Sequence, residues 1–168
     1  MIYLASDHAG FELKEKVKNY LKSAGYDVTD CGANKFDPND DYPDFISKAV
    51  ESVSKDPEES KAVIFGGSGQ AEAMVANKFP NVRCALFYAA VAPFQAADIT
   101  GRKSNDPFEM IRLTREHNDA NVLSIGARFV PEDDALKAVK AWLEQPFTEE
   151  TRHVRRINKI KNFEALSG

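Results

Sequence analysis

A glycine-rich turn followed by a carboxylate is the first feature with chemical potential, in the segment AVIFGGSGQAEAMVANKF at residues 62–79. The apolar residues before Gly66 predict a buried strand, and the alanine-rich residues after Gly69 predict a helix. Amide groups at a helix N-terminus point outwards and carry partial positive charge, so such a turn can hold an anion. Glu72 lies in the first turn of the same helix, where a carboxylate is an unexpected neighbour for an anion.

The same segment also has a purely structural interpretation. Ser68 would cap the helix, and Glu72 would only interact favourably with the helix dipole. The helix N-terminus favours the ionised carboxylate, whereas burial under a ligand would favour the neutral form. The local sequence leaves both interpretations open, together with the pKa of Glu72.

All three histidines lie beside charged or glycine-rich residues. His8, in SDHAG, follows Asp7, which can orient a sugar hydroxyl or a histidine, or can simply cap the next helix. His117, in TREHNDAN, lies at the end of a predicted helix, where a single histidine is often only solvated. His153 belongs to the basic run TRHVRR.

Two arginines of this basic run are spaced to act together. Arg152 and Arg156 are four residues apart, on one side of a helix, and can together bind a phosphate. Arg128, at the end of a predicted strand, would add a third cation. The alternative is an ordinary exposed basic helix face.

Several common kinds of site are not supported. The loop GGSGQ lacks the lysine and serine or threonine of a Walker loop, and it does not form GxGxxG. No HExxH pair suggests a metal-binding helix, and Ser68 does not lie in GxSxG. Cys31 and Cys84 have no metal-binding spacing. The spacing of the residues thus gives no support for a metal or an organic cofactor.

The composition describes an ordinary globular chain. Its 168 residues suit one domain, with 43% hydrophobic and 29% charged residues. The formal net charge of −4 argues against nucleic acid as a partner. No apolar run is long enough to span a membrane, and the N-terminus does not resemble a signal peptide. With two cysteines outside any disulfide pattern, we expect a cytoplasmic location.

Strand and helix patterns alternate along the chain. Apolar strand candidates occupy residues 2–6, 26–30, 62–65, 84–87 and 122–125. Helical patterns occupy residues 10–24, 45–55, 70–78 and 133–143, and a basic C-terminal helix is predicted at about 148–166. This order predicts an α/β fold, a Rossmann-like three-layer α-β-α sandwich around a five-stranded parallel sheet. Ligands bind such sheets beyond the carboxyl ends of the strands, where Asp7, the glycine loop and Arg128 would lie.

The motifs together resemble the ribose-5-phosphate isomerase B family, which also contains galactose-6-phosphate isomerase subunits. The matching segments run from residue 3 to about residue 157: LASDHAGFELK, DYPDF, GGSGQAEAMVANK, VRCAL, REHNDANVLSIGAR and TRHVRRI. The resemblance implies an aldose–ketose isomerase that acts on a phosphosugar through a cis-enediol or enediolate.

Within that family the proton-transferring base is a cysteine in some members and a glutamate in others. The cysteine, where present, opens the glycine loop, and this chain has Gly66 there. The resemblance therefore implies that Glu72 is the base. Ser68 and the amides of the loop would hold the enediolate oxygen, which brings in Gly67, Gly69, Gln70 and Ala71.

The resemblance assigns the remaining roles. His117 and Asn118 would assist ring opening and orient hydroxyls, while Asp7 and Tyr42 would contact the sugar. Phosphate binding would fall to His8, Arg128, Arg152 and Arg156. Family members are dimers or tetramers with sites between subunits, so a homodimer or tetramer is expected, with part of each site from the partner.

One segment departs from the family pattern. The connection between VRCAL and REHND, from Phe87 to Thr114, is longer than usual. It would act as a lid, form a subunit contact, or change the size of the substrate. Our first hypothesis is interconversion of ribose 5-phosphate and ribulose 5-phosphate. The alternatives are the same reaction on allose or galactose 6-phosphate, or a non-catalytic sugar-phosphate sensor.

Overall fold

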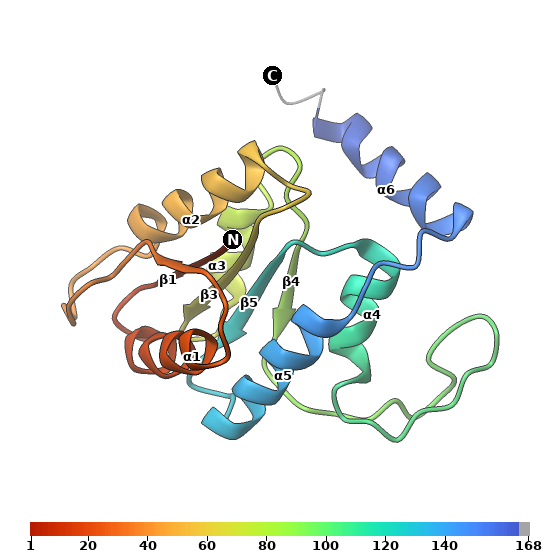
Figure 1. The fold of residues 1–168 in the computed structure, drawn as a ribbon, viewed down its shortest axis with the longest axis horizontal. Coiled ribbons are helices and arrows are strands. Elements are labelled where there is room, and N and C mark those ends of the chain that lie inside the picture. Colours follow the sequence, from red (N-terminus) through yellow and green to blue (C-terminus); the bar gives the residue numbers. More distant parts are fainter. Residues whose placement is uncertain (165–168) are drawn as a thin grey trace.

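A five-stranded parallel sheet forms the centre of the computed structural model, which describes residues 1–164 (Figure 1). The strands are β1 (Ile2–Ser6), β2 (Val28–Asp30), β3 (Lys61–Gly66), β4 (Cys84–Phe87) and β5 (Val122–Gly126). Their order across the sheet is β2-β1-β3-β5-β4, and every neighbouring pair is parallel. The predicted sheet is therefore confirmed.

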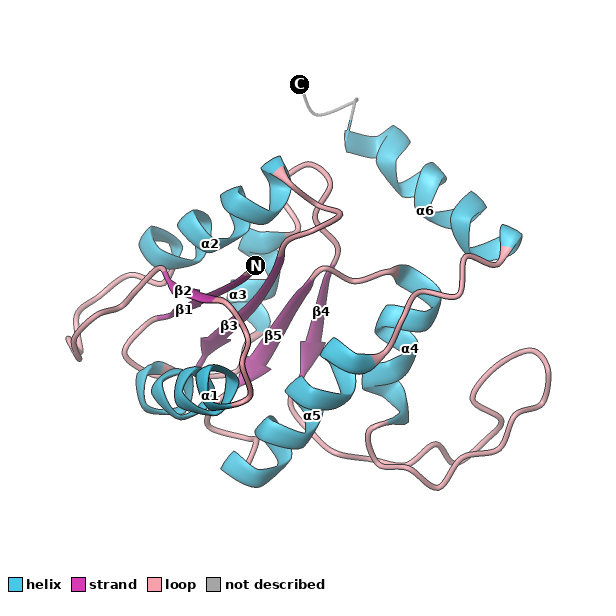
Figure 2. Ribbon diagram, viewed as in Figure 1, coloured by secondary structure: helices cyan, strands magenta, loops and turns pink. Residues whose placement is uncertain are grey.

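Helices cover both faces of this sheet (Figure 2). They are α1 (Phe11–Ser23), α2 (Pro43–Lys55), α3 (Gln70–Ala76), α4 (Glu109–Asn118), α5 (Glu132–Glu144) and α6 (Thr151–Glu164). The residues of α1, α4 and α5 pack into one hydrophobic core, and those of α2 and α3 pack into a second core on the other face. The predicted three-layer sandwich is confirmed.

Strand β3 supplies both cores. Val63 and Phe65 pack on the side of α1 and α5, whereas Ala62 and Ile64 pack on the side of α2 and α3. Successive side chains of a strand point to opposite faces, so a strand buried on both faces must be apolar throughout. This explains the uninterrupted apolar run that leads into the glycine loop.

Several element ends differ from the prediction by one to three residues, and hydrogen bonds explain two of these differences. Strand β2 begins at Val28 and not at residue 26, because Gly25 adopts a left-handed φ of +84° and the Tyr26 amide donates to the Leu21 carbonyl at 3.0 Å. This bond keeps the chain with the end of α1. Helix α3 ends at Ala76 and not at residue 78. The Asn77 side chain follows, and it donates to the carbonyls of Ala73 and Cys84, both at 3.1 Å.

The C-terminal helix α6 begins at Thr151, three residues later than predicted, and it is described as far as Glu164. The predicted residues 165–166 lie outside the described part of the chain. Within residues 1–164, no helix is both long and apolar enough to cross a membrane.

Because the strands are parallel, the sheet has a carboxyl edge, where all strands end, and an amino edge, where all strands begin. Figure 1 shows the arrowheads of β3, β4 and β5 pointing away from α6, so α6 and the end of α4 lie towards the amino ends of the strands. The long connection, residues 88–108, leaves β4 at the carboxyl edge and extends beside α4 before that helix begins.

Candidate active site

The loops after β1, β3 and β5 meet at the carboxyl edge of the sheet. The Ala127 amide donates to the Gly66 carbonyl at 2.8 Å, and the Arg128 amide donates to the Gly67 carbonyl at 3.1 Å. A β carbon added to Gly67 would lie 3.5 Å from the guanidinium carbon of Arg128. The exposed Arg128 side chain therefore lies against the glycine loop.

The glycine loop has its own tight geometry. Gly69 is the N-cap of α3, with a left-handed φ of +73°, and a β carbon there would lie 2.8 Å from Leu86. The predicted N-cap, Ser68, is therefore wrong: its Oγ instead accepts the Gln70 amide at 3.3 Å. The amides of Ser68 and Gly69 donate to no acceptor in the described chain. They are free to bind an anion beside Gln70 and Ala71, the first residues of α3.

Glu72 is buried against this loop. Glu72 is only 3% exposed, and a β carbon added to Gly66 would overlap its carboxylate. Atom Oε2 has no hydrogen-bond partner in the described residues. Burial raises the pKa of Glu72 above its ordinary value, and the nearby charge of Asp7 raises it further, although the residue's own amide opposes them. Burial therefore outweighs the hydrogen bond from this amide.

Asp7 and His8 follow β1 at the same edge. Asp7 Oδ1 accepts the amides of Ala9 and Gly10, at 3.0 and 3.1 Å, so it shapes the turn before α1. His8 Nδ1 donates to Asp40 Oδ1 at 2.7 Å, and the His8 amide donates to the same oxygen at 3.0 Å. Asp40 thus fixes the His8 ring, a role that the sequence analysis missed although DDYPDF contains the residue.

Tyr42 completes what we call the carboxyl-edge cluster. It is half-buried, lies two residues after Asp40, and is the N-cap of α2. The members of the cluster are Asp7, His8, Tyr42, Gly67, Ser68, Gly69, Gln70, Ala71, Glu72 and Arg128.

A second group, the amino-edge cluster, lies at the end of α4 and on α6. It consists of His117, Asn118, Arg152, His153 and Arg156. The rings of His117 and His153 are stacked, with centroids 4.2 Å apart and planes 12° apart. Within the described residues, neither Nε2 atom has a hydrogen-bond partner. Burial lowers the pKa of His153, and His117 and Arg152 lower it further.

The two arginines of this cluster are not equivalent. Arg152 Nε lies 2.8 Å from Glu150 Oε2, whereas Arg156 is exposed on the same helix. Their predicted spacing on one helix is therefore present in α6.

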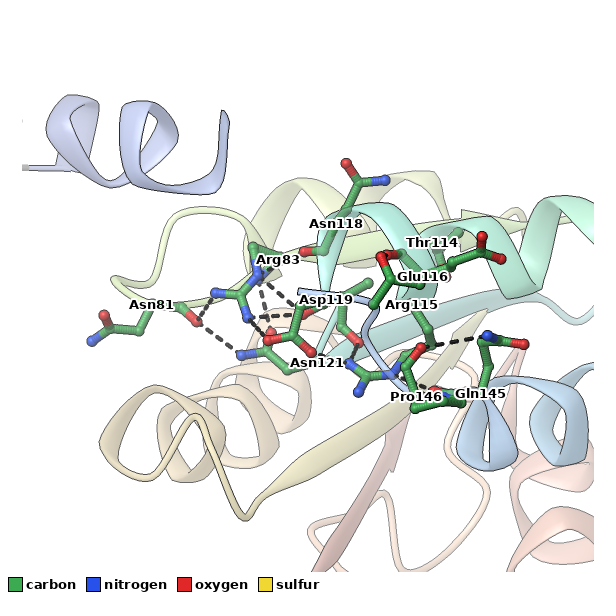
Figure 3. Close-up of polar contacts among 12 residues, drawn as sticks. Asn81, Arg83, Thr114, Arg115, Glu116, Asn118, Asp119, Asn121, Gln145 and Pro146 are labelled. Carbon is green, nitrogen blue, oxygen red and sulfur yellow. Dashed lines mark hydrogen bonds and ion pairs between the residues drawn. The ribbon is translucent and has the colours of Figure 1, made fainter. Parts of the chain in front are cut away.

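An arginine network fixes the end of α4 (Figure 3). Arg83 Nε donates to the Asn118 carbonyl at 2.9 Å, and its Nη2 lies 2.8 Å from Asp119 Oδ2. Arg115 Nη1 holds the other carboxylate oxygen of Asp119 at 2.7 Å. The Asn118 side chain points away from this network (Figure 3) and is exposed. The motifs VRCAL and REHND contained Arg83 and Asp119, but their role depends on contacts between distant segments.

A single chain does not bring the two clusters together. His117 precedes the amino end of β5, whereas Gly66 pairs with Gly126 at its carboxyl end. Four residue steps along a strand separate these ends by roughly 13 Å. Glu72 is therefore separated from His117, and Arg128 from Arg152 and Arg156, within one chain.

In the described residues, two groups of three side chains are close enough to bind a metal ion. One group is Asp7, His8 and Asp40, and the other is Asp98, Glu116 and His117. In the first, His8 and Asp40 bind each other, and in the second, Arg102 is ion-paired to both carboxylates. Burial raises the pKa of both Cys31 and Cys84, so neither thiol is predisposed to act as a base.

The family model described as Ribose/Galactose Isomerase matches residues 2–106 and 105–160. The chain belongs to this family. It is 37% identical over 163 residues to ribose-5-phosphate isomerase B of Mycolicibacterium paratuberculosis, covering 97% of this chain and 91% of that protein. The resemblance deduced from the motifs is confirmed.

Solved structures agree with this assignment. The fold is similar to ribose-5-phosphate isomerase B of Mycoplasma genitalium with bound ribulose-5-phosphate, with a TM-score of 0.83, 35% identity, and coverage of 98% of this chain and 95% of that one. The Clostridium thermocellum enzyme gives a TM-score of 0.83 at 34% identity, covering 99% of each chain. This family member is an aldose–ketose isomerase.

The raised pKa of Glu72 has a consequence for stability. The folded chain holds a proton on Glu72 more readily than the unfolded chain does, so this residue's contribution to stability is full below its ordinary pKa and is lost as pH rises through the raised one. We expect Glu72→Gln, which cannot ionise, to unfold at a higher temperature than wild type at neutral pH. The difference should disappear near pH 4, which thermal unfolding across pH would measure. Glu12→Gln, at the exposed first turn of α1, is the control; a pH-independent difference would contradict the expectation.

The contact between Gly66 and Glu72 can be tested by adding one methyl group. In Gly66→Ala the β carbon would displace the Glu72 carboxylate. Because the family resemblance implies that Glu72 is the base, we expect a loss of about 10²-fold in kcat/KM. Isomerase assays and thermal unfolding would separate lost activity from lost folding. Gly67→Ala, whose β carbon makes only an ordinary contact at 3.5 Å, is the control for stability. Full activity in a folded Gly66→Ala variant would disprove the packing.

Proposed function

We propose that this isomerase interconverts ribose 5-phosphate and ribulose 5-phosphate, with Glu72 as the base and without a metal. The observation that carries the proposal is the buried Glu72 carboxylate beside the unpaired Ser68 and Gly69 amides. Burial raises the pKa of this carboxyl group, which brings a general base closer to neutral pH. The Mycoplasma genitalium relative with bound ribulose-5-phosphate supports the choice of sugar.

Ring opening would come first. His117 takes the proton of the O1 hydroxyl, the C1–O4 bond breaks as the C1 aldehyde forms, and O4 receives a proton. Asn118, whose side chain points away from its own helix network, would orient the sugar hydroxyls. Tyr42 and Asp7 would contact the sugar from the carboxyl-edge cluster.

Proton transfer would follow at Glu72. Its carboxylate removes the C2 proton, the C1–C2 double bond forms, and the electron pair of the carbonyl moves to O1. The amides of Ser68 and Gly69, with the Ser68 hydroxyl, would stabilise this developing charge, and Gly67, Gln70 and Ala71 would line the same loop. Glu72 then returns the proton to C1, while the O2 hydroxyl proton passes to O1 and the C2 carbonyl forms.

The complete site would require two chains. Because the two clusters lie at opposite ends of β5, a two-fold dimer would join the carboxyl-edge cluster of one chain to the amino-edge cluster of the other. His8 and Arg128 would then meet Arg152 and Arg156 of the other chain around the phosphate. Val154 and Ile160, partly exposed apolar residues of α6, offer apolar surface for such a contact.

Other attributes follow from the same proposal. The free thiols of Cys31 and Cys84 fit a reducing cytoplasm, and the chain would act as a single domain. A six-carbon phosphosugar is the second candidate substrate, and the long connection at residues 88–108 favours it because that segment ends at α4, which carries His117. A sensor role is less favoured, because the chain has both a candidate base, Glu72, and a candidate ring-opening histidine, His117.

The base assignment predicts a large and specific loss of activity. Glu72→Gln should reduce kcat by about 10²–10⁴-fold, while excess EDTA should leave wild-type turnover unchanged. The assay is ribulose 5-phosphate formation from ribose 5-phosphate, with allose and galactose 6-phosphate in parallel. Glu12→Gln should remain fully active. Turnover retained in Glu72→Gln would move the base elsewhere, and EDTA inhibition would reject the metal-free mechanism.

Shared sites predict complementation between two inactive variants. Glu72→Gln and His117→Gln, expressed together, would form mixed dimers in which one of the two sites has both groups intact. Random pairing makes half of the dimers mixed, so about a quarter of wild-type activity should return. Glu72→Gln with Asp7→Asn, two defects of the same cluster, should recover nothing. No recovery in the first mixture would rule out sites shared between chains.

A further inference from the structure

The long connection at residues 88–108 is attached to α4 along the length of that helix. At its return end, Arg112 Nε lies 3.1 Å from Asp106 Oδ2, and Ser104 Oγ donates to Glu109 Oε2 at 3.0 Å. At its tip, Arg102 reaches the last turn of α4 and pairs with Glu116. The segment is therefore a built structure and not a loose loop.

Arg102 joins three carboxylates. Its Nη2 atom lies 3.0 Å from Glu109 Oε1 and 3.1 Å from Glu116 Oε2, and its Nε lies 3.3 Å from Asp98 Oδ2. The three acidic side chains are only 7–11% exposed, whereas Arg102 is 38% exposed. Glu109 and Glu116 are seven residues apart, two turns along one face of α4. One guanidinium thus holds carboxylates that would otherwise repel one another.

The tip that carries Arg102 is a compact turn. The Ala97 amide donates to the Arg102 carbonyl at 2.7 Å, and Gly101 takes a left-handed φ of +82°. Asp98 Oδ1 accepts both the amide and the hydroxyl of Thr100, at 2.8 and 2.6 Å. The hydroxyl bond is the main reason why the pKa of Asp98 is lowered. The turn thereby presents an ionised Asp98 and Arg102 to α4 together.

This turn meets the ring-opening histidine. A carboxylate oxygen of Asp98, a carboxylate oxygen of Glu116 and a ring nitrogen of His117 all lie within 4.8 Å of one another. His117 Nε2 is 3.8 Å from Glu116 Oε1. On its other side the His117 ring is stacked on His153. The network around Arg83 fixes the backbone beyond His117, but Arg102 is the cation that holds Glu116, the residue immediately before it.

We propose that Arg102 is a positioning residue for His117, supplied by the long connection, which holds Asp98 and Glu116 so that the His117 ring keeps its place against His153. The inference rests on the proposed function, because it assigns His117 to ring opening. Without Arg102, three close carboxylates lose their shared cation, and the turn separates from the end of α4. Glu72, at the other edge of the sheet, is unaffected.

This separation gives the role a kinetic signature. Ribulose 5-phosphate cannot close a furanose ring, because the hydroxyl that would close it carries the phosphate. Removal of its C1 proton therefore needs Glu72 but no ring chemistry, whereas conversion of cyclic ribose 5-phosphate to ribulose 5-phosphate needs both proton transfer and ring opening. A defect in positioning His117 should slow net conversion and spare exchange of the C1 proton with solvent.

The test compares Arg102→Met with Arg112→Met. Arg112 forms a similar ion pair between the same segment and the same helix, but with Asp106, at the end remote from His117. Proton NMR in D₂O measures C1 exchange with ribulose 5-phosphate as the starting sugar, and net conversion with cyclic ribose 5-phosphate as the starting sugar. We expect Arg102→Met to lower net conversion about tenfold or more while C1 exchange stays near the wild-type rate. Arg112→Met should change neither, and His117→Gln should show the same split as Arg102→Met.

A second measurement is independent of turnover. The chain has three histidines, so ring nitrogen NMR signals are few, and His117→Gln identifies one of them. Arg102→Met should shift the signals of His117 and its stacked neighbour His153 but not those of His8. Arg102→Lys, which keeps the charge, should partly restore net conversion.

Three outcomes would overturn the proposal. Unchanged net conversion or unmoved His117 signals in Arg102→Met would show that Arg102 does not position the ring. Equal loss of exchange and conversion, with a lower unfolding temperature, would show a general structural role. Wild type without exchange or conversion on any phosphosugar would instead reject the proposed function, and with it the role of Arg102 in ring opening.

Discussion

The carboxylate of Glu72, held out of water against the backbone of Gly66, is the constraint on which the site depends. A charged carboxylate costs free energy when it is buried, so its pKa rises unless partners compensate. Here few groups compensate for burial, because Oε2 has no hydrogen-bond partner in the described chain and the charge of Asp7 raises the pKa further. Because Gly66 has no side chain, the Glu72 carboxylate has space to lie against its backbone. Because Gly69 has none, the tight turn before α3 can pack closely against Leu86.

The parallel sheet determines what one chain can achieve around that carboxylate. Its carboxyl edge collects loops from β1, β3 and β5, so Glu72, the free amides and Arg128 come together by topology alone. Helix α4 runs back to the amino edge, as every crossover between parallel strands must. The same topology therefore places His117, Asn118 and the arginines of α6 at the far end of β5, which is why a second chain is part of the proposed site.

Charged networks fix the far half of the site. At the end of α4, Arg83 pairs with Asp119 and Arg102 pairs with Glu116. The carboxylates in these contacts are partly buried, and burying a carboxylate costs free energy unless it is paired. Here a guanidinium fixed beside each carboxylate offsets that cost. The segment at residues 88–108 thus places a group of charges next to His117.

The sequence by itself determined the order of the elements, the five parallel strands and the family. Periodicity and turn residues act locally, and motifs such as GGSGQAEAMVANK and REHNDANVLSIGAR survive in order along the chain. It also indicated Glu72 as the acid beside the glycine loop, because this chain has Gly66 at the position where some family members have a cysteine. The errors at β2 and α3 came from hydrogen bonds of Tyr26 and Asn77 that no sequence pattern encodes.

Only the tertiary structure decided the protonation and the partners of the site residues. Burial of Glu72 against Gly66 raises the pKa of its carboxyl group, a direction that the sequence left open. The partners Asp40, Arg83 and Arg102 come from segments distant in the chain from the histidines they support, or from a connection without a recognisable pattern. Such contacts are set by how the loops fold back on the sheet, and a sequence read residue by residue contains no record of that geometry.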